Sequence, residues 1–144
     1  MIQRLQSLWL LIAAALMALF CTQPLMWLVN NAAPSIATAL TPMQMPDTLC
    51  VGIVTSLLLL IAIFLFKNMK RQKTVVKCSI MLTIVEIAVL AFTAFTFNGE
   101  NGQPAVASYN WSLALPVVSL LFSIAGYRYI RRDENLLKAA DRLR

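Results

Sequence analysis

The sequence contains no histidine, and only 12% of its 144 residues are charged. Without histidine, the chain cannot provide an imidazole general base or a histidine ligand for a metal or a haem. The four glycines are dispersed, so they form no phosphate-binding loop. The sequence also has no paired carboxylates and no activated nucleophile. It therefore predicts a protein that is not an enzyme and that uses no cofactor.

Apolar residues are abundant, since 60% of the chain is hydrophobic and the mean hydropathy is +0.75. Soluble domains are about 45–50% apolar, so this composition indicates a membrane protein. Four apolar runs lie at residues 5–28, 49–66, 75–97 and 111–130. Each run can cross a hydrocarbon core of about 30 Å as a helix. We therefore predict a single domain, residues 1–144, that forms an all-α integral membrane bundle of four transmembrane helices.

The twelve lysines and arginines all lie near the chain ends or in and around the link between the second and third runs. The other two links contain no basic residue and carry only Asp47 and Glu100. Because cytoplasmic segments are enriched in lysine and arginine, both termini and the middle link are predicted to be cytoplasmic. The net charge of +6 comes from these clusters, so we predict no binding to nucleic acid.

The first apolar run can alternatively be interpreted as a cleaved signal peptide, because Arg4 precedes it. The run is longer than the apolar core of a usual signal peptide, so a first transmembrane helix is favoured. In the link that follows, Pro34 is predicted to open a short interfacial helix that continues through Leu40. Residues 98–110 are interpreted as a plain turn between the third and fourth helices.

The three cysteines, Cys21, Cys50 and Cys78, lie within or beside apolar runs and share no short spacing, so we interpret them as small buried hydrophobes. Cys21 and Cys50 both lie toward the predicted outer side, but at depths that differ by roughly 6 Å, which is poor geometry for a disulfide. We therefore predict free thiols. Met43 and Met45 are soft ligands near Cys50, but they lack the spacing of a copper site, and no metal site is predicted.

The segment after the fourth run, residues 131–144, is predicted to form an amphipathic cytoplasmic tail helix, which either continues the fourth helix or bends onto the membrane. Apolar side chains recur there at helical spacing and form one stripe, which consists of Leu136, Leu137, Ala140 and Leu143. Acidic residues stand near the start of the segment and basic residues near its end, as the helix dipole favours. With Arg131 and Arg132, the stripe is predicted to contact either anionic lipid at the cytoplasmic face or a partner protein.

One acidic residue, Glu86, lies near the centre of the third apolar run, residues 75–97. A carboxylate at that depth costs several kcal/mol unless it is protonated, paired or hydrated. We expect a neutral carboxylic acid that donates a hydrogen bond to Ser56 or Ser119, at a level where the alanines at 13–15 permit close helix approach. The alternative is that Glu86 relays protons or cations.

A family resemblance is carried by the two ends of the chain. They read MIQRLQSL at residues 1–8 and RDENLL at residues 132–137, followed by DRLR at residues 141–144. These segments resemble a family of bacterial four-helix membrane proteins that is classed as a domain of unknown function. The resemblance implies a location in the bacterial inner membrane and four helices, and it implies no activity.

Two functional hypotheses remain from the sequence. The first is a non-enzymatic accessory or scaffold subunit of a larger inner-membrane complex, whose partners are the lipid bilayer and other membrane proteins. This hypothesis rests on the short links, the lack of catalytic residues and the patterned tail. The alternative is a small oligomeric transporter or channel that is coupled to protons or ions through Glu86.

Overall fold

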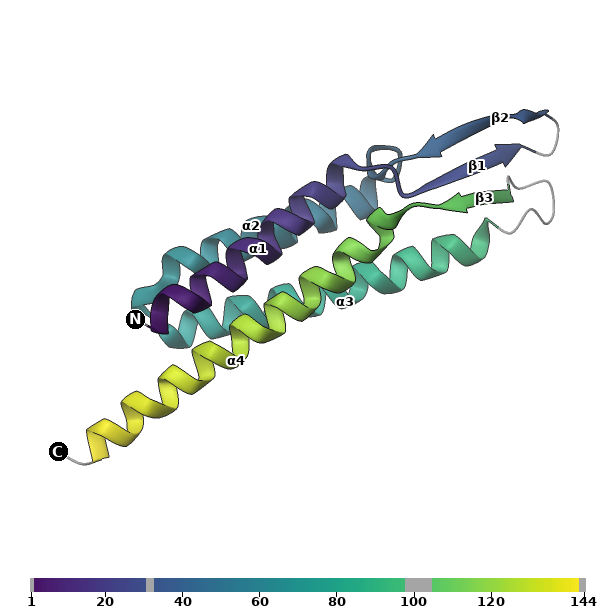
Figure 1. The fold of residues 1–144 in the computed structure, drawn as a ribbon. Coiled ribbons are helices and arrows are strands. Elements are labelled where there is room, and N and C mark those ends of the chain that lie inside the picture. Colours follow the sequence, from purple (N-terminus) through teal and green to yellow (C-terminus); the bar gives the residue numbers. More distant parts are fainter. Residues whose placement is uncertain (1, 31–32, 98–104, 143–144) are drawn as a thin grey trace.

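The computed structural model describes residues 2–30, 33–97 and 105–142 of the chain. Its four long helices are α1 (Ile2–Thr22), α2 (Pro46–Phe64), α3 (Met69–Thr96) and α4 (Leu115–Arg142). All four are long and apolar enough to cross a membrane, so the four predicted apolar helices are confirmed. Successive helices run in opposite directions, and both chain ends lie at the same end of the bundle (Figure 1).

Short 3-10 helices stand at three helix ends: η1 (Pro42–Gln44), η2 (Leu65–Lys67) and η4 (Trp111–Ala114). The helix α2 begins with Pro46 at its first position and carries Asp47 in its first turn. Both residues favour a helix start, because proline lacks the amide hydrogen that a first turn leaves unpaired and a carboxylate complements the helix dipole. This start lies three residues before the predicted one.

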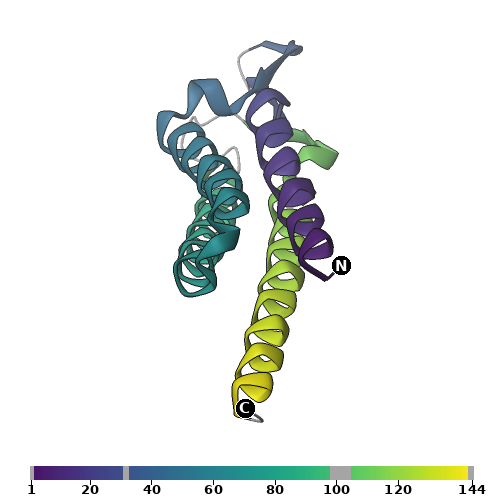
Figure 2. The ribbon, with the colours of Figure 1, turned by 90° about the vertical axis from the view of Figure 1, so that its left-hand side faces the viewer.

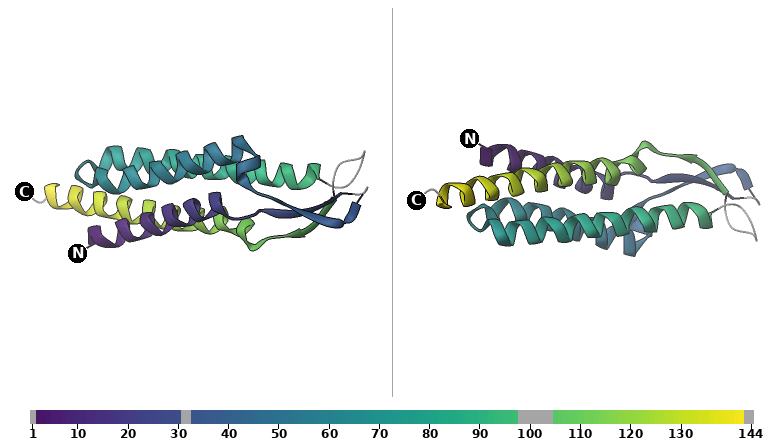
Figure 3. Two further views of the ribbon diagram at one scale, coloured as in Figure 1. Left: turned by 90° about the horizontal axis from the view of Figure 1, so that it is seen from above. Right: turned by 90° about the horizontal axis from the view of Figure 1, so that it is seen from below.

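The helices form two layers, with α1 beside α4 and α2 beside α3 (Figure 3). The layers meet because α1 also packs on α2 and α3 also packs on α4. The buried positions of α3 alternate in steps of four and three residues: Gln72, Val76, Ser79, Thr83, Glu86, Leu90 and Thr93. This period of 3.5 residues keeps one face of the helix turned toward its neighbours along the whole bundle.

A three-stranded antiparallel sheet lies at the end of the bundle that is opposite the termini (Figure 1). Its strands are β1 (Met26–Asn30), β2 (Ala33–Leu40) and β3 (Ala105–Tyr109), and β1 is the central strand. The all-α prediction is therefore wrong in this respect. The predicted helix from Pro34 through Leu40 is a strand, and the predicted turn at residues 98–110 contains one.

The first helix ends at Thr22, six residues before the predicted end. Pro24 explains the difference, because a proline disfavours the helical conformation of the residue before it and cannot donate a backbone hydrogen bond. The next residues, Met26–Asn30, include aromatic and β-branched side chains and pair with both other strands. Hydropathy alone does not distinguish this apolar strand from a continuing helix.

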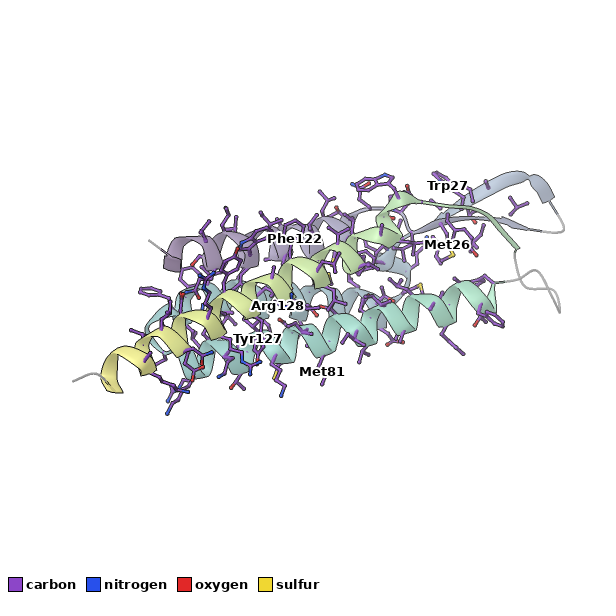
Figure 4. All side chains as sticks on the ribbon, turned by 60° about the horizontal axis from the view of Figure 1, so that its bottom comes forward. Met26, Trp27, Met81, Phe122, Tyr127 and Arg128 are labelled. Carbon is purple, nitrogen blue, oxygen red and sulfur yellow. The ribbon has the colours of Figure 1, made fainter. Side chains whose placement is uncertain are left out.

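The sheet lies beside the last turns of α3, which extends past the other three helices at this end of the bundle (Figure 1). Met26 and Leu28 are buried, whereas Trp27 between them is 41% exposed, as expected for a strand with one covered face (Figure 4). Ala94 and Phe97, at the end of α3, pack against the same hydrophobic core. The sheet and the end of α3 therefore form an apolar cap on the bundle.

The helix α4 continues without interruption to Arg142, so the described residues 131–142 belong to α4 and form no separate tail helix. No proline follows Pro116 in this helix, and Gly126 is its only glycine. Lys138 and Glu134, one turn apart, form an ion pair of 2.8 Å that supports the continuing helix. The C-terminal part of α4 projects past the other three helices (Figure 2).

Candidate functional site

Glu86 lies on the buried face of α3 and has no exposed surface. Neither of its carboxylate oxygens has a hydrogen-bond partner among the groups that the structure describes. A buried acid without a partner is costly, and such groups are found mainly where function requires them. Glu86 is therefore the centre of the candidate site.

The depth of Glu86 differs from the depth expected from the sequence. Ser56 lies nine residues before the link between α2 and α3 begins at Leu65, whereas Glu86 lies eighteen residues after the link ends at Asn68. At 1.5 Å per residue, this places the two side chains about 14 Å apart along the helix axes. The structure thus does not bring Ser56 beside Glu86, because α3 begins six residues earlier than predicted.

Ser56 and Ser119 both contact α1. The Ser56 hydroxyl donates to the carbonyl oxygen of Ala14 at 3.3 Å, and the Ser119 hydroxyl donates to that of Ala13 at 3.0 Å. Ala13 and Ala14 are fully or almost fully buried, so the small side chains allow the close approach that was expected there. The two serines therefore link α2 and α4 to successive carbonyl groups of α1.

Other buried hydroxyl groups line the interior of the bundle. Four of them donate to carbonyl oxygens of their own helix three or four residues earlier: Thr55, Ser79, Thr83 and Thr93. The hydroxyls of Thr48 and Ser123 have no partner in the described part of the chain. Thr48 lies seventeen residues before Leu65 and is therefore level with Glu86. This level of the bundle therefore contains an unpartnered carboxyl group on α3 and an unpartnered hydroxyl group on α2.

A second polar cluster lies at the end of the bundle that carries the termini. The Gln6 side chain on α1 donates to the carboxylate of Asp133 on α4, and both residues are buried. Lys73 on α3 donates to Glu134 at 2.5 Å, and Lys138 pairs with the same carboxylate. These contacts attach the start of the projecting part of α4 to both α1 and α3.

Five of the six residues predicted to contact a partner or lipid lie in the C-terminal part of α4. Arg131, Arg132, Leu136 and Leu137 are all exposed. The backbone of Ala140 is helical, but its side chain is not among those described, and Leu143 lies outside the described residues. The structure therefore brings four of the six predicted contact residues to the surface.

Several structural contacts were not anticipated from the sequence. The side-chain amide of Asn110 donates to the carbonyl oxygen of Pro24 at 2.8 Å, and the Ser112 hydroxyl donates to the same oxygen. Asn110 also accepts from the backbone amide of Trp111 and caps η4. These bonds attach the end of α1 to the start of the fourth helical segment. The signal for them was Pro24, which ends α1 and leaves its carbonyl group without a helical donor.

Two glycines allow helices to approach closely. A Cβ atom on Gly52 of α2 would lie 2.7 Å from the Cys21 sulfur, and one on Gly126 of α4 would lie 2.9 Å from a terminal carbon of Leu10. All three cysteines are free thiols, but Cys50 and Cys78 are exposed, so the prediction that all three are buried is wrong. Within the described ranges, no three potential ligands among cysteine, aspartate and glutamate gather to hold a metal ion.

Comparison with known proteins gives one match. A family model, DUF4293, described as a domain of unknown function, matches residues 2–143 and thus nearly the whole chain. No curated protein and no solved structure matches the chain.

Proposed function

We propose a function from the structure itself, because the chain belongs to the DUF4293 family, which is described as a domain of unknown function. We infer an integral protein of the bacterial inner membrane, whose four helices cross the bilayer and whose termini are both cytoplasmic. Four membrane-length apolar helices support insertion. All twelve lysines and arginines lie near a chain end, in the α2–α3 link or in the first part of α3. This distribution supports the cytoplasmic location of both termini.

In this membrane, the protein acts as a non-enzymatic accessory or scaffold subunit of a larger complex. The observation that carries the proposal is the projecting part of α4, which presents Leu136 and Leu137 with 52% and 53% of their surface exposed. Arg131 and Arg132 are exposed about one turn earlier on the same helix. An apolar pair beside two cations fits an acidic amphipathic helix on the cytoplasmic side of a partner membrane protein.

The projecting segment is suited to this role because its start is attached on two sides. The contacts of Asp133 with Gln6 and of Glu134 with Lys73 join it to α1 and α3. A partner that binds the segment is therefore held in a defined position relative to the bundle. Because the segment is already helical, little conformational entropy is lost when it binds.

Photo-crosslinking in native membranes tests this proposal. A photoreactive residue at Leu136 is expected to form one discrete protein adduct, whereas the same residue at Leu57, which is also 52% exposed but lies on α2, is expected to label lipid. The adduct is expected to disappear when Arg131 and Arg132 are changed to glutamate and to persist when Lys70 and Arg71 are changed to glutamate. Lipid labelling alone at Leu136, or equal sensitivity to both charge reversals, would contradict docking to an acidic partner.

A second candidate function is favoured by the unpartnered carboxyl group of Glu86 and the unpartnered hydroxyl group of Thr48 at the same level. A protonatable group inside a bundle of membrane-length helices is the central element of a proton relay. In this function, an oligomer of the protein conducts protons or cations, and Glu86 binds them in transit.

Proton flux into liposomes under a membrane potential distinguishes this second candidate. Glu86→Gln is expected to lower the flux of the wild type at least about tenfold, because an amide cannot release a proton. Ser56→Ala is the matched control, since it removes a buried hydroxyl group about 14 Å away along the axis, at a different level of the bundle. Equal flux in wild type and Glu86→Gln would remove Glu86 from any conduction pathway.

A further inference from the structure

A groove of about 660 Å³ runs along the outer face of α4 beside α1. Its lining consists of Trp9 on α1 and of Leu121, Ile124, Ala125, Arg128, Tyr129 and Arg132 on α4. The volume lies within the range of about 300–1,000 Å³ that is usual for sites that bind small molecules. The groove does not include Glu86 or the exposed leucines of the projecting segment, and it shares only Arg132 with the proposed partner surface.

The α1 side of the groove is held rigidly by aromatic contacts. The Trp9 ring stacks on Tyr129 with a centroid distance of 6.3 Å and an interplanar angle of 11°, and it contacts Phe122 at 5.2 Å. Figure 4 shows Phe122 on the side of α4 that is turned toward α1. Gly126 lies between the two aromatic residues of α4 and allows this close packing, because any side chain there would meet Leu10. The wall of the groove is therefore a preformed structure.

The lining changes from apolar to cationic along the helix. Leu121, Ile124 and Ala125 lie toward the middle of the bundle, and the two arginines lie toward the end that carries the termini. Arg128 and Arg132 are one turn apart, so their guanidinium groups emerge from the same face of α4. The nearby acids bind other residues: Asp133 accepts from Gln6, and Glu134 pairs with Lys73 and Lys138. Within the described part of the chain, neither arginine forms an ion pair.

We propose that this groove binds one anionic phospholipid of the adjacent bilayer leaflet. The phosphate group binds between the guanidinium groups of Arg128 and Arg132, which present hydrogen-bond donors in a geometry that matches phosphate oxygens. An acyl chain lies along Leu121, Ile124 and Ala125, whose apolar surfaces continue into the hydrocarbon region. Trp9 and Tyr129 flank the boundary between the two parts, at the level where amphipathic rings collect in membrane proteins.

Native mass spectrometry of the detergent-purified full chain tests the proposal, with phosphatidylglycerol and phosphatidylcholine as probes. We expect one phosphatidylglycerol per chain to bind at least about tenfold more tightly than phosphatidylcholine, and Arg128→Gln with Arg132→Gln to remove that preference. The control is Lys70→Gln with Arg71→Gln, which removes the same charge from another face of the bundle and is expected to leave the preference unchanged. All four side chains are exposed, so neither double variant affects the core.

The variant Ala125→Leu distinguishes the binding of a lipid from the binding of a free anion. It fills the apolar part of the groove and leaves both arginines in place, so it is expected to weaken phosphatidylglycerol binding at least about fivefold. A thermal melt of each variant confirms that the bundle is intact. An equal loss of the lipid preference in the Arg128/Arg132 and the Lys70/Arg71 double variants would overturn the proposal in favour of diffuse electrostatic attraction. Binding that is insensitive to Ala125→Leu and is displaced by millimolar inorganic phosphate would assign the arginines to a soluble anion and overturn it as well.

Discussion

Gly126→Leu is expected to lower the free energy of unfolding by about 3 kcal/mol. A Cβ atom at this position of α4 would lie 2.9 Å from one carbon of Leu10 and 3.2 Å from another, and Leu10 is fully buried in α1. The leucine side chain therefore has no space unless α1 moves away from α4. Such a movement would also lengthen the hydrogen bond from Ser119 to Ala13, because that bond joins the same two helices.

The leucine variant is more informative than Gly126→Ala. Alanine gains up to about 1 kcal/mol of helix propensity over glycine, and this gain offsets part of the cost of one added methyl group. Leucine gains no more propensity than alanine but adds three further carbons, so the steric cost decides the result. Unfolding of the purified protein by titration with a denaturing detergent measures the difference.

Two further variants make the Gly126 prediction specific. Ala88→Leu adds a leucine at an exposed position of α3 and is expected to change the stability by less than about 0.5 kcal/mol. Combining Leu10→Ala with Gly126→Leu is expected to cost less than the sum of the two single changes, because the alanine vacates the space that the leucine needs. Two results would show that α1 and α4 do not cross at this glycine. One is that the losses of unfolding free energy from Leu10→Ala and Gly126→Leu add up in the double variant, and the other is that Gly126→Leu is as stable as Ala88→Leu.

Glu86→Lys is expected to have the second large effect, a loss of about 3 kcal/mol or more. The lysine ammonium would be buried in α3, where neither oxygen of the native carboxyl group has a partner among the described groups. Unlike a lysine near a helix end, it lies about ten residues before the end of α3 and cannot easily reach the polar interface. The same detergent titration, compared with the wild type, gives the loss.

Conservative changes at Glu86 separate a structural role from a functional one. Glu86→Gln is expected to be about as stable as the wild type, and Glu86→Ala less stable, because alanine leaves a cavity. Glu86→Met removes the buried polar atoms at similar volume, so it is expected to equal or exceed the stability of the wild type. A stable Glu86→Met protein that lacks proton flux would assign the acid to function. If glutamine proved as damaging as lysine, the ionised carboxylate would itself be needed for the fold.

Much of the helical architecture was predictable because it depends on the summed hydropathy of consecutive residues. Residues 49–66 and 75–97 are apolar enough to cross a membrane wherever they pack, and both lie largely within helices of the structure. The charged residues after Phe66 indicated an end for the second run close to the observed end of α2 at Phe64, whereas the start at Pro46 was predicted three residues too late. Family membership was likewise predictable, since the resemblance was carried by residues at both chain ends and the family match covers residues 2–143.

The strands were not predictable from hydropathy, because their stability depends on residues far apart in the chain. Met26–Asn30 pairs with Ala105–Tyr109, about 80 positions away, and neither segment has the alternation of polar and apolar residues that marks a half-exposed strand. The buried polar face of α3, in contrast, could have been recognised from the sequence. The spacing of Gln72, Ser79, Thr83, Glu86 and Thr93 follows a period of 3.5 residues, which identifies one face of α3 without reference to any other helix.

The sequence by itself determined that this chain forms four helices of membrane length with an acid inside the third, since composition and periodicity are properties of each segment alone. The tertiary structure decided at which level of the bundle that acid lies and which hydroxyl groups are directed elsewhere. It placed Thr48 level with Glu86 and directed Ser56 and Ser119 to the backbone of α1. It also brought Trp9 against the arginine face of α4. These arrangements depend on where each helix begins and how closely two glycines let the helices approach, and such pairwise distances are not encoded in any single segment.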